Sequence, residues 1–482
     1  MSIWVVQRLL GILLMVFSLS LLPPAFISLW QGTEETTDFL HSFAITLSAG
    51  LLIWAPVRDY RRDMRIRDGF IIVALFWTAL GLAGSLPLIL AESVDIPVTD
   101  AVFESLSGLT TTGATVLIGL DELPISVLYY RQQLQWLGGM GIVVLAVAIM
   151  PMLGIGGMQL YRAEMPGPVK DNKLTPRITE TAKALWYIYL GLTVACGLCF
   201  WLAGMTPFDA LAHAYSTVAI GGFSTHDASI GHFDSPLVMA VAVVFMLLSG
   251  MNYALHFAAL RSHSWRVYLA DAECRAYLFI IGMVALITIV YLQFTHTFEG
   301  FQALMHGIFQ VVSIATTTGF TTAEYFVWPG FLPVLLLFTS FIGACASSTG
   351  GGMKVIRCLL LYKQGRREII QLIHPAARVP VKLGDKAVPE SVINAVWGFF
   401  ALYVTTFTVM LLLLMATGLD QITAFSAVAA CINNLGPGLG DVGANFAQIN
   451  APAKVILCFA MLLGRLEIFT LLVLLSPAFW RR

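Results

Sequence analysis

The sequence predicts an all-α polytopic membrane protein, with a two-helix leader followed by four repeats of a helix, a short re-entrant loop and a second helix. Three observations predict this fold class. Of the 482 residues, 58% are hydrophobic and 11% are charged, and the mean hydropathy is +0.82. Apolar segments long enough to cross a bilayer recur along the whole chain. Between them, one motif occurs four times, which indicates an internal repeat.

Ten segments are long and apolar enough to span a bilayer, which takes about 17 to 25 residues. They are residues 9–30, 38–57, 69–92, 132–153, 183–204, 236–258, 276–296, 331–361, 392–417 and 453–480. The first of them could be mistaken for a secretory signal. No small-residue cleavage site follows it and the apolar run resumes after Pro23 and Pro24, so we expect it to be retained.

Basic residues are spread unevenly over the connections between these spans. The connection after the second span carries five arginines between residues 58 and 67, whereas the connection before it carries no basic residue. Because Lys and Arg collect on the cytoplasmic side, the alternation of spans places both termini inside. All but three of the 27 basic residues then lie at or near the cytoplasmic face. The three are Arg131 and Lys454, predicted outside, and Arg465, predicted within the membrane.

The repeated motif lies in the segments between spans three and four, five and six, seven and eight, and nine and ten. The four copies are DAVFESLSGLTTTGATVL, DALAHAYSTVAIGGFSTHD, FQALMHGIFQVVSIATTTGFTT and DQITAFSAVAACINNLGPGLGD, with matched glycines at Gly113, Gly222, Gly319 and Gly436. Asp100 and Asp209 open the first two copies, where we expect them to be helix N-caps. Each half-length helix is too short to cross, so the chain must enter from the outside and turn back. Backbone at this depth is tolerated only when it is buried in protein or lines a water-filled path.

These repeats divide the chain into five predicted parts. They are a two-span leader (1–68), repeat 1 with its pore loop (69–161), repeat 2 with its pore loop (162–262), repeat 3 with its pore loop and a further intramembrane loop (263–375), and repeat 4 with its pore loop (376–482).

Threonine and glycine at these turns suit the binding of a dehydrated cation. Such a cation needs oxygens in place of its water shell, which a ring of backbone carbonyls provides. Glycine allows the backbone angles that such a loop needs, and threonine adds a hydroxyl. The preceding half-helices aim their negative C-terminal ends at the same point. No ring of Asp or Glu lies beside the glycines, which argues against a divalent-selective pore. The alternative is that these small residues only let helices pack closely, which explains one loop better than four in register.

The motifs TTTGAT, AIGGFST, TTTGFTT and NNLGPGLGD, together with SSTGGGMKVIR and the two-span leader, resemble the TrkH, TrkG and KtrB potassium transporter family, most of all its TrkH members. The resemblance covers essentially the whole chain. It implies a potassium-channel-like fold with four non-identical repeats around one pore in pseudo-fourfold arrangement. It also implies potassium coordination by the backbone of Thr110, Thr111, Thr112, Gly113, Ala219, Ile220, Gly221, Gly222, Thr316, Thr317, Thr318, Gly319, Asn433, Asn434, Leu435 and Gly436. Each loop keeps only one matched glycine, which puts strong selectivity over sodium in doubt.

The eighth span is interrupted by GACASSTGGGMKVIR. Three glycines inside a helix cost about 1 kcal/mol each relative to alanine, so we expect a break there. In TrkH-like proteins this segment is an intramembrane loop that blocks the pore below the filter. The resemblance therefore implies a gate made of Ser348, Thr349, Gly350, Gly351, Gly352, Lys354 and Arg465. An arginine inside the membrane needs a partner. The resemblance suggests that Arg465 contacts the carbonyls of the glycine loop, and the alternative is a purely structural salt bridge, although Glu467 at i+2 points elsewhere on the helix.

The resemblance also implies partners and location. It implies a homodimer in the lipid of a bacterial cytoplasmic (inner) membrane, bound to a cytosolic TrkA-like regulatory subunit that carries the nucleotide, NAD or ATP/ADP. We expect no cofactor in this chain, potassium as the bound substrate and no nucleic-acid partner. The chain has no phosphate-binding loop and no nucleophile elbow, so we do not expect an enzyme. An alternating-access secondary transporter and a membrane enzyme remain alternatives, and passive flow and proton symport both remain open.

Overall fold

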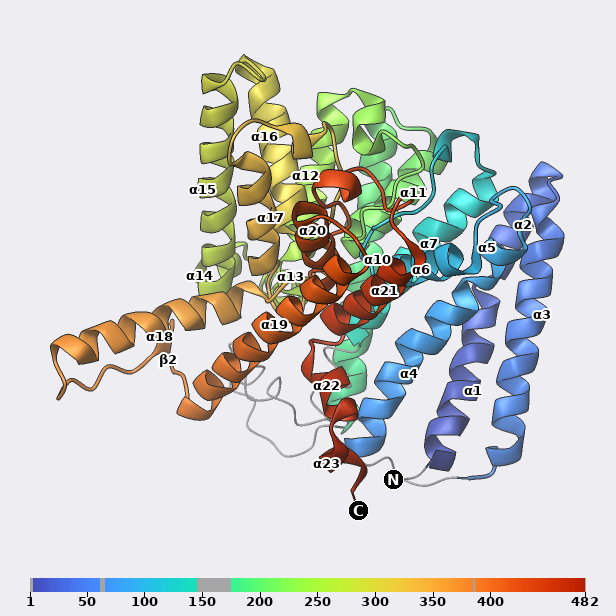
Figure 1. The fold of residues 1–482 in the computed structure, drawn as a ribbon, viewed down its shortest axis with the longest axis horizontal. Coiled ribbons are helices and arrows are strands. Elements are labelled where there is room, and N and C mark those ends of the chain that lie inside the picture. The colour runs from blue at the N-terminus through green and yellow to red at the C-terminus, as the bar shows by residue number, and fades with distance from the viewer. Residues whose placement is uncertain (1–2, 61–65, 145–174, 385, 482) are drawn as a thin grey trace.

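The computed structural model describes residues 3–60, 66–144, 175–384 and 386–481. Nearly all of its helices gather in one bundle, and both ends of the described chain lie on the same side of it (Figure 1). The leader consists of α1 (Ile3–Leu19), α2 (Leu22–Gln31) and α3 (Glu35–Trp54), followed by the 3-10 turn η1 (Ala55–Val57). The first predicted span is divided between α1 and α2 because Pro23 and Pro24 begin a new helix there. The leader packs at the edge of the bundle, where α1 contacts α3 and α4.

Each repeat has the predicted order of a helix, a short pore helix and a second helix. Repeat 1 contains α4 (Ile66–Gly84), α5 (Leu86–Leu90), the pore helix α6 (Val98–Leu109), η2 (Leu120–Glu122) and α7 (Ile125–Val144). Repeat 2 contains α10 (Thr175–Leu202), the pore helix α11 (Pro207–Ala219), η4 (Ser229–Phe233), α12 (Pro236–Gly250) and α13 (Tyr253–Ser262).

Repeats 3 and 4 follow the same order with additions on one side of the bundle. Repeat 3 contains α14 (Arg266–Ala270), α15 (Ala272–Phe294), the pore helix α16 (Gly300–Ala315), η5 (Tyr325–Val327), α17 (Leu332–Ile342) and α18 (Val355–Ile373). A small antiparallel hairpin of β1 (Lys382–Leu383) and β2 (Lys386–Ala387) leads into repeat 4. Repeat 4 contains α19 (Glu390–Ala416), the pore helix α20 (Gln421–Ile432), η6 (Gly440–Val442), α21 (Ala451–Arg465), α22 (Phe469–Leu475) and α23 (Pro477–Trp480).

The second helix of repeats 2, 3 and 4 is broken, and two of these breaks were not predicted. The predicted span 236–258 is bent by 96° between α12 and α13, and the predicted span 453–480 is bent by 116° between α21 and α22. The predicted span 331–361 ends at Ile342, and the chain resumes as a helix only at Val355, so the predicted break at the glycines is confirmed. Within the described residues, six helices can cross a membrane by length and composition, or up to eight if each bent pair is one span.

Two other predicted boundaries differ from the structure. The span predicted at 132–153 begins at Ile125, because Arg131 and the glutamines after it are buried inside the protein instead of marking a helix end. Its end, and the predicted boundary between repeats 1 and 2 at 161/162, lie outside the described residues. Asp100 and Asp209 are third residues of their helices and not N-caps. The N-cap positions are Pro97, which makes no side-chain cap, and Thr206, whose hydroxyl accepts from the Asp209 N–H.

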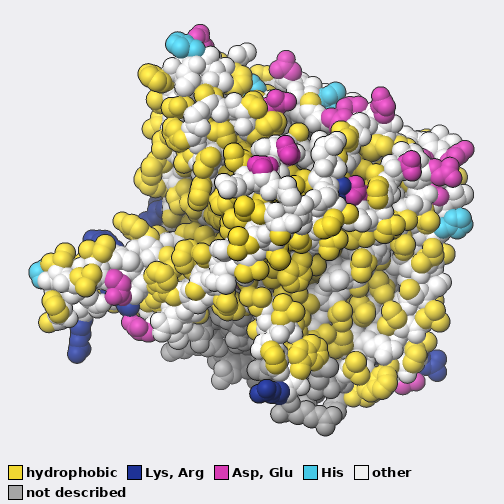
Figure 2. Space-filling model, in the orientation of Figure 1, with side chains coloured by type: hydrophobic (Ala, Val, Ile, Leu, Met, Phe, Trp, Pro, Cys, Tyr) yellow, Lys and Arg dark blue, Asp and Glu magenta, His cyan; other side chains and the backbone are white. Residues whose placement is uncertain are grey.

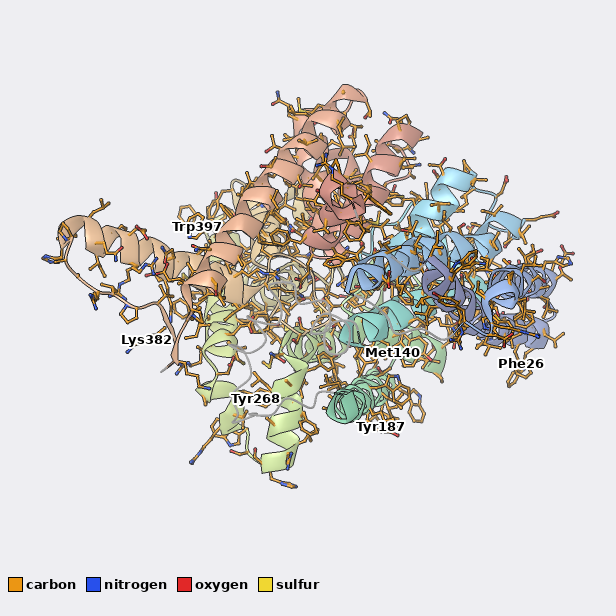
Figure 3. The ribbon with its side chains drawn as sticks, turned by 90° about the horizontal axis from the view of Figure 1, so that it is seen from below. Phe26, Met140, Tyr187, Tyr268, Lys382 and Trp397 are labelled. Carbon is orange, nitrogen blue, oxygen red and sulfur yellow. The ribbon has the colours of Figure 1, made fainter. Side chains whose placement is uncertain are left out.

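On the face shown in Figure 2, side chains of opposite charge lie mostly toward opposite ends of the bundle. Acidic and histidine side chains lie mostly in the upper part, and lysine and arginine lie mostly in the lower part and along α18. A broad hydrophobic band separates them. Seen from below, α18 and the hairpin with Lys382 extend away from the bundle, on the side opposite the leader helices that carry Phe26 (Figure 3).

Candidate functional site

Four turn segments follow the four pore helices and share one backbone conformation. We call residues 110–113, 219–222, 316–319 and 433–436 the turn segments. The second residue of each has a left-handed φ between 51° and 65°, and these residues are Thr111, Ile220, Thr317 and Asn434. The third residue donates its N–H to the carbonyl five residues earlier, at 2.8 Å in all four copies. This is the hydrogen bond of a Schellman helix end, so each segment takes its shape from its own pore helix.

The turn segments meet one another in a closed ring. The fourth residue of each is the matched glycine, with φ between 80° and 97°. A methyl group built on the glycine of repeats 1, 2 and 3 would lie 2.0–2.1 Å from the third-residue carbonyl oxygen of the next repeat. These pairs are Gly113 with Gly221, Gly222 with Thr318, and Gly319 with Leu435. The same methyl on Gly436 would lie 2.8 Å from the carbonyl oxygen of Thr112, which returns to repeat 1. The four repeats therefore surround one axis, with backbone oxygens at every junction.

The side chains of the turn segments are held in two different ways. In repeats 1 and 3 the first and third threonines share a hydrogen bond, Thr110 with Thr112 at 2.8 Å and Thr316 with Thr318 at 2.7 Å. In repeat 4, Asn433 donates to Ser340 Oγ at 3.0 Å and accepts from the Tyr403 hydroxyl. In repeats 1 and 3 the first threonine also donates to a carbonyl of its own pore helix at 2.7 Å, which fixes its side chain.

A glycine loop, residues 343–354, lies directly against the turn segments on the side where the pore helices end. Thr349 Oγ1 donates to the Val218 carbonyl at 3.0 Å, beside the repeat 2 segment. The Gly351 N–H donates to Thr317 Oγ1 at 2.7 Å, and the Gly352 N–H donates to the Asn433 carbonyl at 3.1 Å. The loop therefore contacts three of the four repeats through its own backbone and side chains.

Gly351 is required by this close approach. A methyl group there would lie 1.9 Å from the Asn433 carbonyl oxygen, closer than a side chain can come to backbone.

The unpredicted break between α12 and α13 leaves backbone groups that form hydrogen bonds with the glycine loop. The Gly250 carbonyl accepts from Cys345 N–H at 2.9 Å, and the Tyr253 N–H donates to the Ser347 carbonyl at 3.2 Å.

Arg465 joins the glycine loop to the turn segment of repeat 1. Its Nη1 donates to the Thr349 carbonyl at 3.2 Å, and its Nε donates to the Thr110 carbonyl at 2.7 Å. Its Nη2 also contacts Thr111 Oγ1. Arg465 is the last residue of α21, where the chain bends, and is 6% exposed. Its partners in the structure are thus oxygens of Thr110, Thr111 and Thr349. Glu467 instead pairs with Arg357 at 2.6 Å.

A cavity opens beside the glycine loop and carries more positive than negative charge. Its charged lining consists of Lys354, Arg357, Arg465 and Glu467. Lys354 Nζ donates to the Gly350 carbonyl, which ties the end of the loop to its glycines. Because only one carboxylate faces three basic groups, this cavity is unfavourable for a cation.

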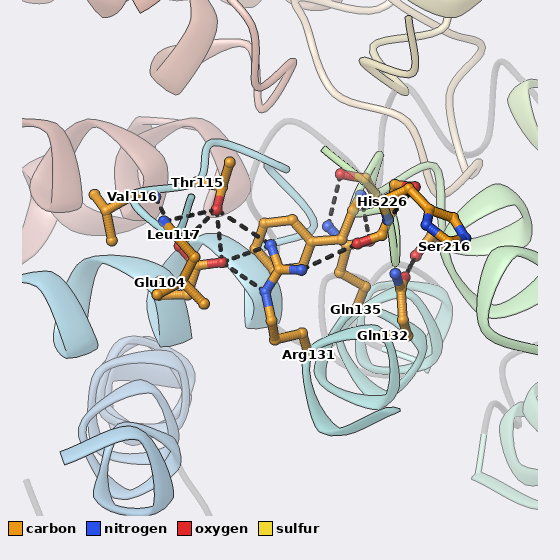
Figure 4. A network of polar contacts seen from close by, with 12 residues as sticks. Glu104, Thr115, Val116, Leu117, Arg131, Gln132, Gln135, Ser216 and His226 are labelled. Atoms are coloured by element: carbon orange, nitrogen blue, oxygen red, sulfur yellow. Dashed lines mark hydrogen bonds and ion pairs between the residues drawn. The ribbon is translucent and has the colours of Figure 1, made fainter. Parts of the chain in front are cut away.

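Two buried ion pairs link pore helix α6 to neighbouring helices, and neither was predicted from the sequence. Lys454 contacts Asp100 at 2.8 Å, which connects α21 to the first turn of α6. Arg131 contacts Glu104 at 2.8 Å, with both side chains 1% exposed, and this pair is drawn in Figure 4. Both basic residues were predicted outside, at the ends of spans. Only the folded chain shows that each neutralises an acid of pore helix α6.

Comparison with known proteins identifies the family. The family model TrkH, described as a cation transport protein, matches residues 35–482. The chain is 57% identical over 477 residues to the Trk system potassium uptake protein TrkH of Vibrio parahaemolyticus, covering 98% of both chains. It is 54% identical to the protein of the same name from Escherichia coli, covering 99% of both.

The chain belongs to the TrkH family of cation transport proteins. A solved structure supports the fold: the crystal structure of the potassium transporter TrkH from Vibrio parahaemolyticus matches with a TM-score of 0.93 and 54% identity, covering 100% of both chains. Trk system potassium uptake protein TrkG of Escherichia coli is more distant, at 42% identity over 99% of this chain and 98% of its own. The predicted family and fold class are confirmed. As a TrkH-family chain with several apolar helices of spanning length, the protein is an integral membrane protein. The relatives are named as uptake proteins, in agreement with the prediction that the chain is not an enzyme.

Proposed function

We propose that this chain takes up potassium across the bacterial cytoplasmic (inner) membrane, with the four turn segments as its selectivity filter. The single observation that carries the proposal is the closed ring of turn segments, in which each matched glycine meets the third-residue carbonyl of the next repeat. Backbone oxygens placed around one axis can replace the water shell of a monovalent cation. The pore helices end at this ring, so their dipoles favour positive charge there. The relatives' names, potassium uptake proteins, supply the choice of ion.

The glycine loop and Arg465 act as the gate of this path. The loop contacts the turn segments of repeats 3 and 4 at Thr317 and Asn433, and the end of the repeat 2 pore helix at Val218. Arg465 reaches the turn segment of repeat 1 by donating to the Thr110 carbonyl. An ion leaving the ring would meet the loop and then the excess of positive charge in the cavity. Moving the loop would have to break the Arg465 hydrogen bond to Thr349, so this arginine sets the resistance to opening.

We further propose that the chain is a homodimer and is regulated by a cytosolic TrkA-like subunit that carries the nucleotide, NAD or ATP/ADP. The relatives are named as parts of a Trk system. Both described chain ends and most visible lysines and arginines lie on one side of the bundle, which supports cytoplasmic termini. The helix α18 extends from this side and exposes Tyr362, Ile369 and Leu372, so it offers apolar surface for a partner subunit.

The alternative, an alternating-access transporter coupled to a second ion, would be expected to show inverted or two-fold repeats. The contacts of this chain instead run from repeat 1 through repeats 2, 3 and 4 and back to repeat 1. This cyclic arrangement favours a channel-like mechanism over alternating access. If uptake were symport with protons, a proton gradient would drive the accumulation of rubidium in liposomes, which can be measured directly.

The test is rubidium uptake into liposomes that contain the purified protein, with potassium or sodium added as competitor and protein-free liposomes as control. We expect potassium to block rubidium uptake at much lower concentration than sodium does. Uptake should follow the rubidium gradient, with no added effect of an imposed proton gradient. Uptake that needs the proton gradient would favour the alternating-access alternative, and the absence of cation uptake would exclude both.

A further inference from the structure

The turn segment of repeat 2 lacks the side chains that hold the segments of repeats 1 and 3. Those segments have threonine at the first and third positions, joined by a hydroxyl–hydroxyl hydrogen bond. Repeat 2 has Ala219 and Gly221 at these positions, which carry no polar side chain. Its second residue, Ile220, is β-branched and still has a left-handed φ of 54°, which is an unfavourable conformation for such a residue. The repeat 2 segment has the backbone bond to its pore helix, from the Gly221 N–H to the Ser216 carbonyl at 2.8 Å, but lacks the side-chain bond of repeats 1 and 3.

Gln135 of α7 supplies two hydrogen bonds to this segment. Its Nε2 donates to the Gly221 carbonyl at 2.7 Å, and its Oε1 accepts from the Phe223 N–H at 3.0 Å. The two bonded residues lie on either side of Gly222, the matched glycine. Gln135 is 0% exposed, so no water competes for these bonds. One side chain of repeat 1 thus holds the turn of repeat 2 at two points (Figure 4).

The space at Gly221 fits this role. A methyl group built on Gly221 would lie 2.3 Å from the Gln135 side-chain amide carbon, so any larger residue would collide with the glutamine. Gly221 has no left-handed φ, so the reason for glycine here is space and not backbone conformation. The glycine at the third position therefore leaves the space that the Gln135 side chain occupies.

The face of α7 that carries Gln135 is also held against repeat 2 by a second side chain. Arg131 lies four residues earlier on α7, which places it on the same face. Its Nη1 donates to the Ser224 carbonyl at 3.1 Å, and its guanidinium lies 4.3 Å from the Phe223 ring centre. The Glu104 carboxylate holds the other edge of the guanidinium. Helix α7 therefore positions the chain from residue 221 to residue 224 through two side chains.

We propose that Gln135 is a positioning residue of the filter, which holds the repeat 2 turn segment in place of the threonine pair of repeats 1 and 3. This inference rests on the proposed function of the turn segments. Without Gln135, the Gly221 carbonyl loses its donor and the Phe223 N–H is left unpaired in a buried place, which favours a different turn. A changed turn in one quarter of the ring alters the oxygen cage, so the preference for potassium over sodium should fall while the pore stays open.

The test compares Gln135→Leu with Gln133→Leu by rubidium uptake in liposomes, with potassium and sodium as competitors. Gln133 is the matched control because it lies on the same helix, is buried, and donates to the Ser20 carbonyl of the leader at 2.9 Å, away from the ring. We expect the sodium-to-potassium ratio of inhibitory concentrations to fall about tenfold in Gln135→Leu, as expected when about 1.4 kcal/mol of discrimination is lost. It should be unchanged in Gln133→Leu. Partial misfolding lowers the number of active molecules but leaves this ratio unchanged.

A second pair of variants tests the contact itself. Gly221→Ala should lower uptake several-fold, because its methyl group collides with Gln135. The double variant Gln135→Ala with Gly221→Ala should recover uptake, although not ion preference. Equal ratios in wild type, Gln135→Leu and Gln133→Leu, or a double variant no better than Gly221→Ala, would overturn the role of Gln135. Wild-type protein without potassium-sensitive uptake would instead overturn the proposed function.

Discussion

The four turn segments and the glycine loop lie against each other, yet their shapes have different sources. Each turn segment is formed by its own pore helix, through the same 2.8 Å backbone hydrogen bond in every repeat. The glycine loop is held mainly by other parts of the chain, through contacts to Gly250, Val218, Thr317, Asn433 and Arg465. A shape made locally resists change at a distance, whereas a shape made by separate contacts can be released by losing some of them. The turn segments therefore suit the proposed role of a fixed filter, and the glycine loop suits the proposed role of a moving gate.

The largest expected effect is at the matched glycines. In Gly319→Ser, a Cβ would lie 2.1 Å from the Leu435 carbonyl oxygen, at a φ of 86° that L-residues rarely adopt. We expect the preference for potassium over sodium in rubidium uptake to fall at least tenfold. Gly436→Ser is the matched comparison, because its Cβ would lie 2.8 Å from the Thr112 carbonyl oxygen, and its loss of preference should be smaller. Equal preference for potassium over sodium in Gly319→Ser and wild type would contradict the proposal that the turn segments form the selectivity filter.

The second effect is expected at Arg465, where a substitution should change the rate of uptake and not the ion preference. Arg465→Ala removes the hydrogen bonds to Thr110 and Thr349 and one positive charge from the cavity. We expect rubidium uptake to rise several-fold at unchanged ion preference, because the loop is released while the turns remain. Arg275→Ala, at an exposed position near the start of α15, serves as the control and should behave like wild type. Reduced uptake by well-folded Arg465→Ala protein would speak against an arginine that resists opening.

The variant Gly351→Ala tests whether the glycine loop or the repeat 4 turn segment moves when the two are forced apart. The new methyl group would lie 1.9 Å from the Asn433 carbonyl oxygen, so either the loop or the turn segment must shift. Because the turn is held by its own helix, we expect the loop to move, with uptake raised about threefold and ion preference retained. The same change at Gly365 in α18, where a methyl meets nothing within 4 Å, is the control. A loss of ion preference would mean that the turn segment shifts and that the glycine loop is the more rigid of the two regions.

The smallest effect is expected when a turn segment loses only a side-chain hydrogen bond. Thr316→Val keeps the shape of the residue but removes the hydroxyl contacts to Val312 and Thr318, both 2.7 Å. A neutral hydrogen bond contributes about 1 kcal/mol, and the backbone bonds of the helix end remain. Ion preference in rubidium uptake should therefore change less than threefold. A change as large as that of Gly319→Ser would show that the hydroxyls, and not the backbone, maintain the turn.

The repeats explain why much of the site could be predicted. The matched glycines, the pore helices and the break at Gly350–Gly352 all depend on local chemistry, and the structure has the helices and the break where they were expected. The bends after Gly250 and Arg465 were missed because the apolar runs on both sides of each bend are together long enough to be one continuous span. Asn252, which caps α13 by accepting from the Ala254 N–H, was the one available signal for the first bend.

The membrane class, the fourfold repeat and the turn at the end of each pore helix could all be predicted from the order of residues alone. These follow from hydrophobic length, repetition and helix-end chemistry, which act over a few residues. The partners of the buried charges emerge only in the folded chain, Lys454 with Asp100, Arg131 with Glu104 and Glu467 with Arg357. The same is true of the hydrogen bonds from Gln135 of one repeat to Gly221 and Phe223 of the next. A buried charge or amide must find a partner wherever the fold places one, and that place can lie hundreds of residues away in the chain.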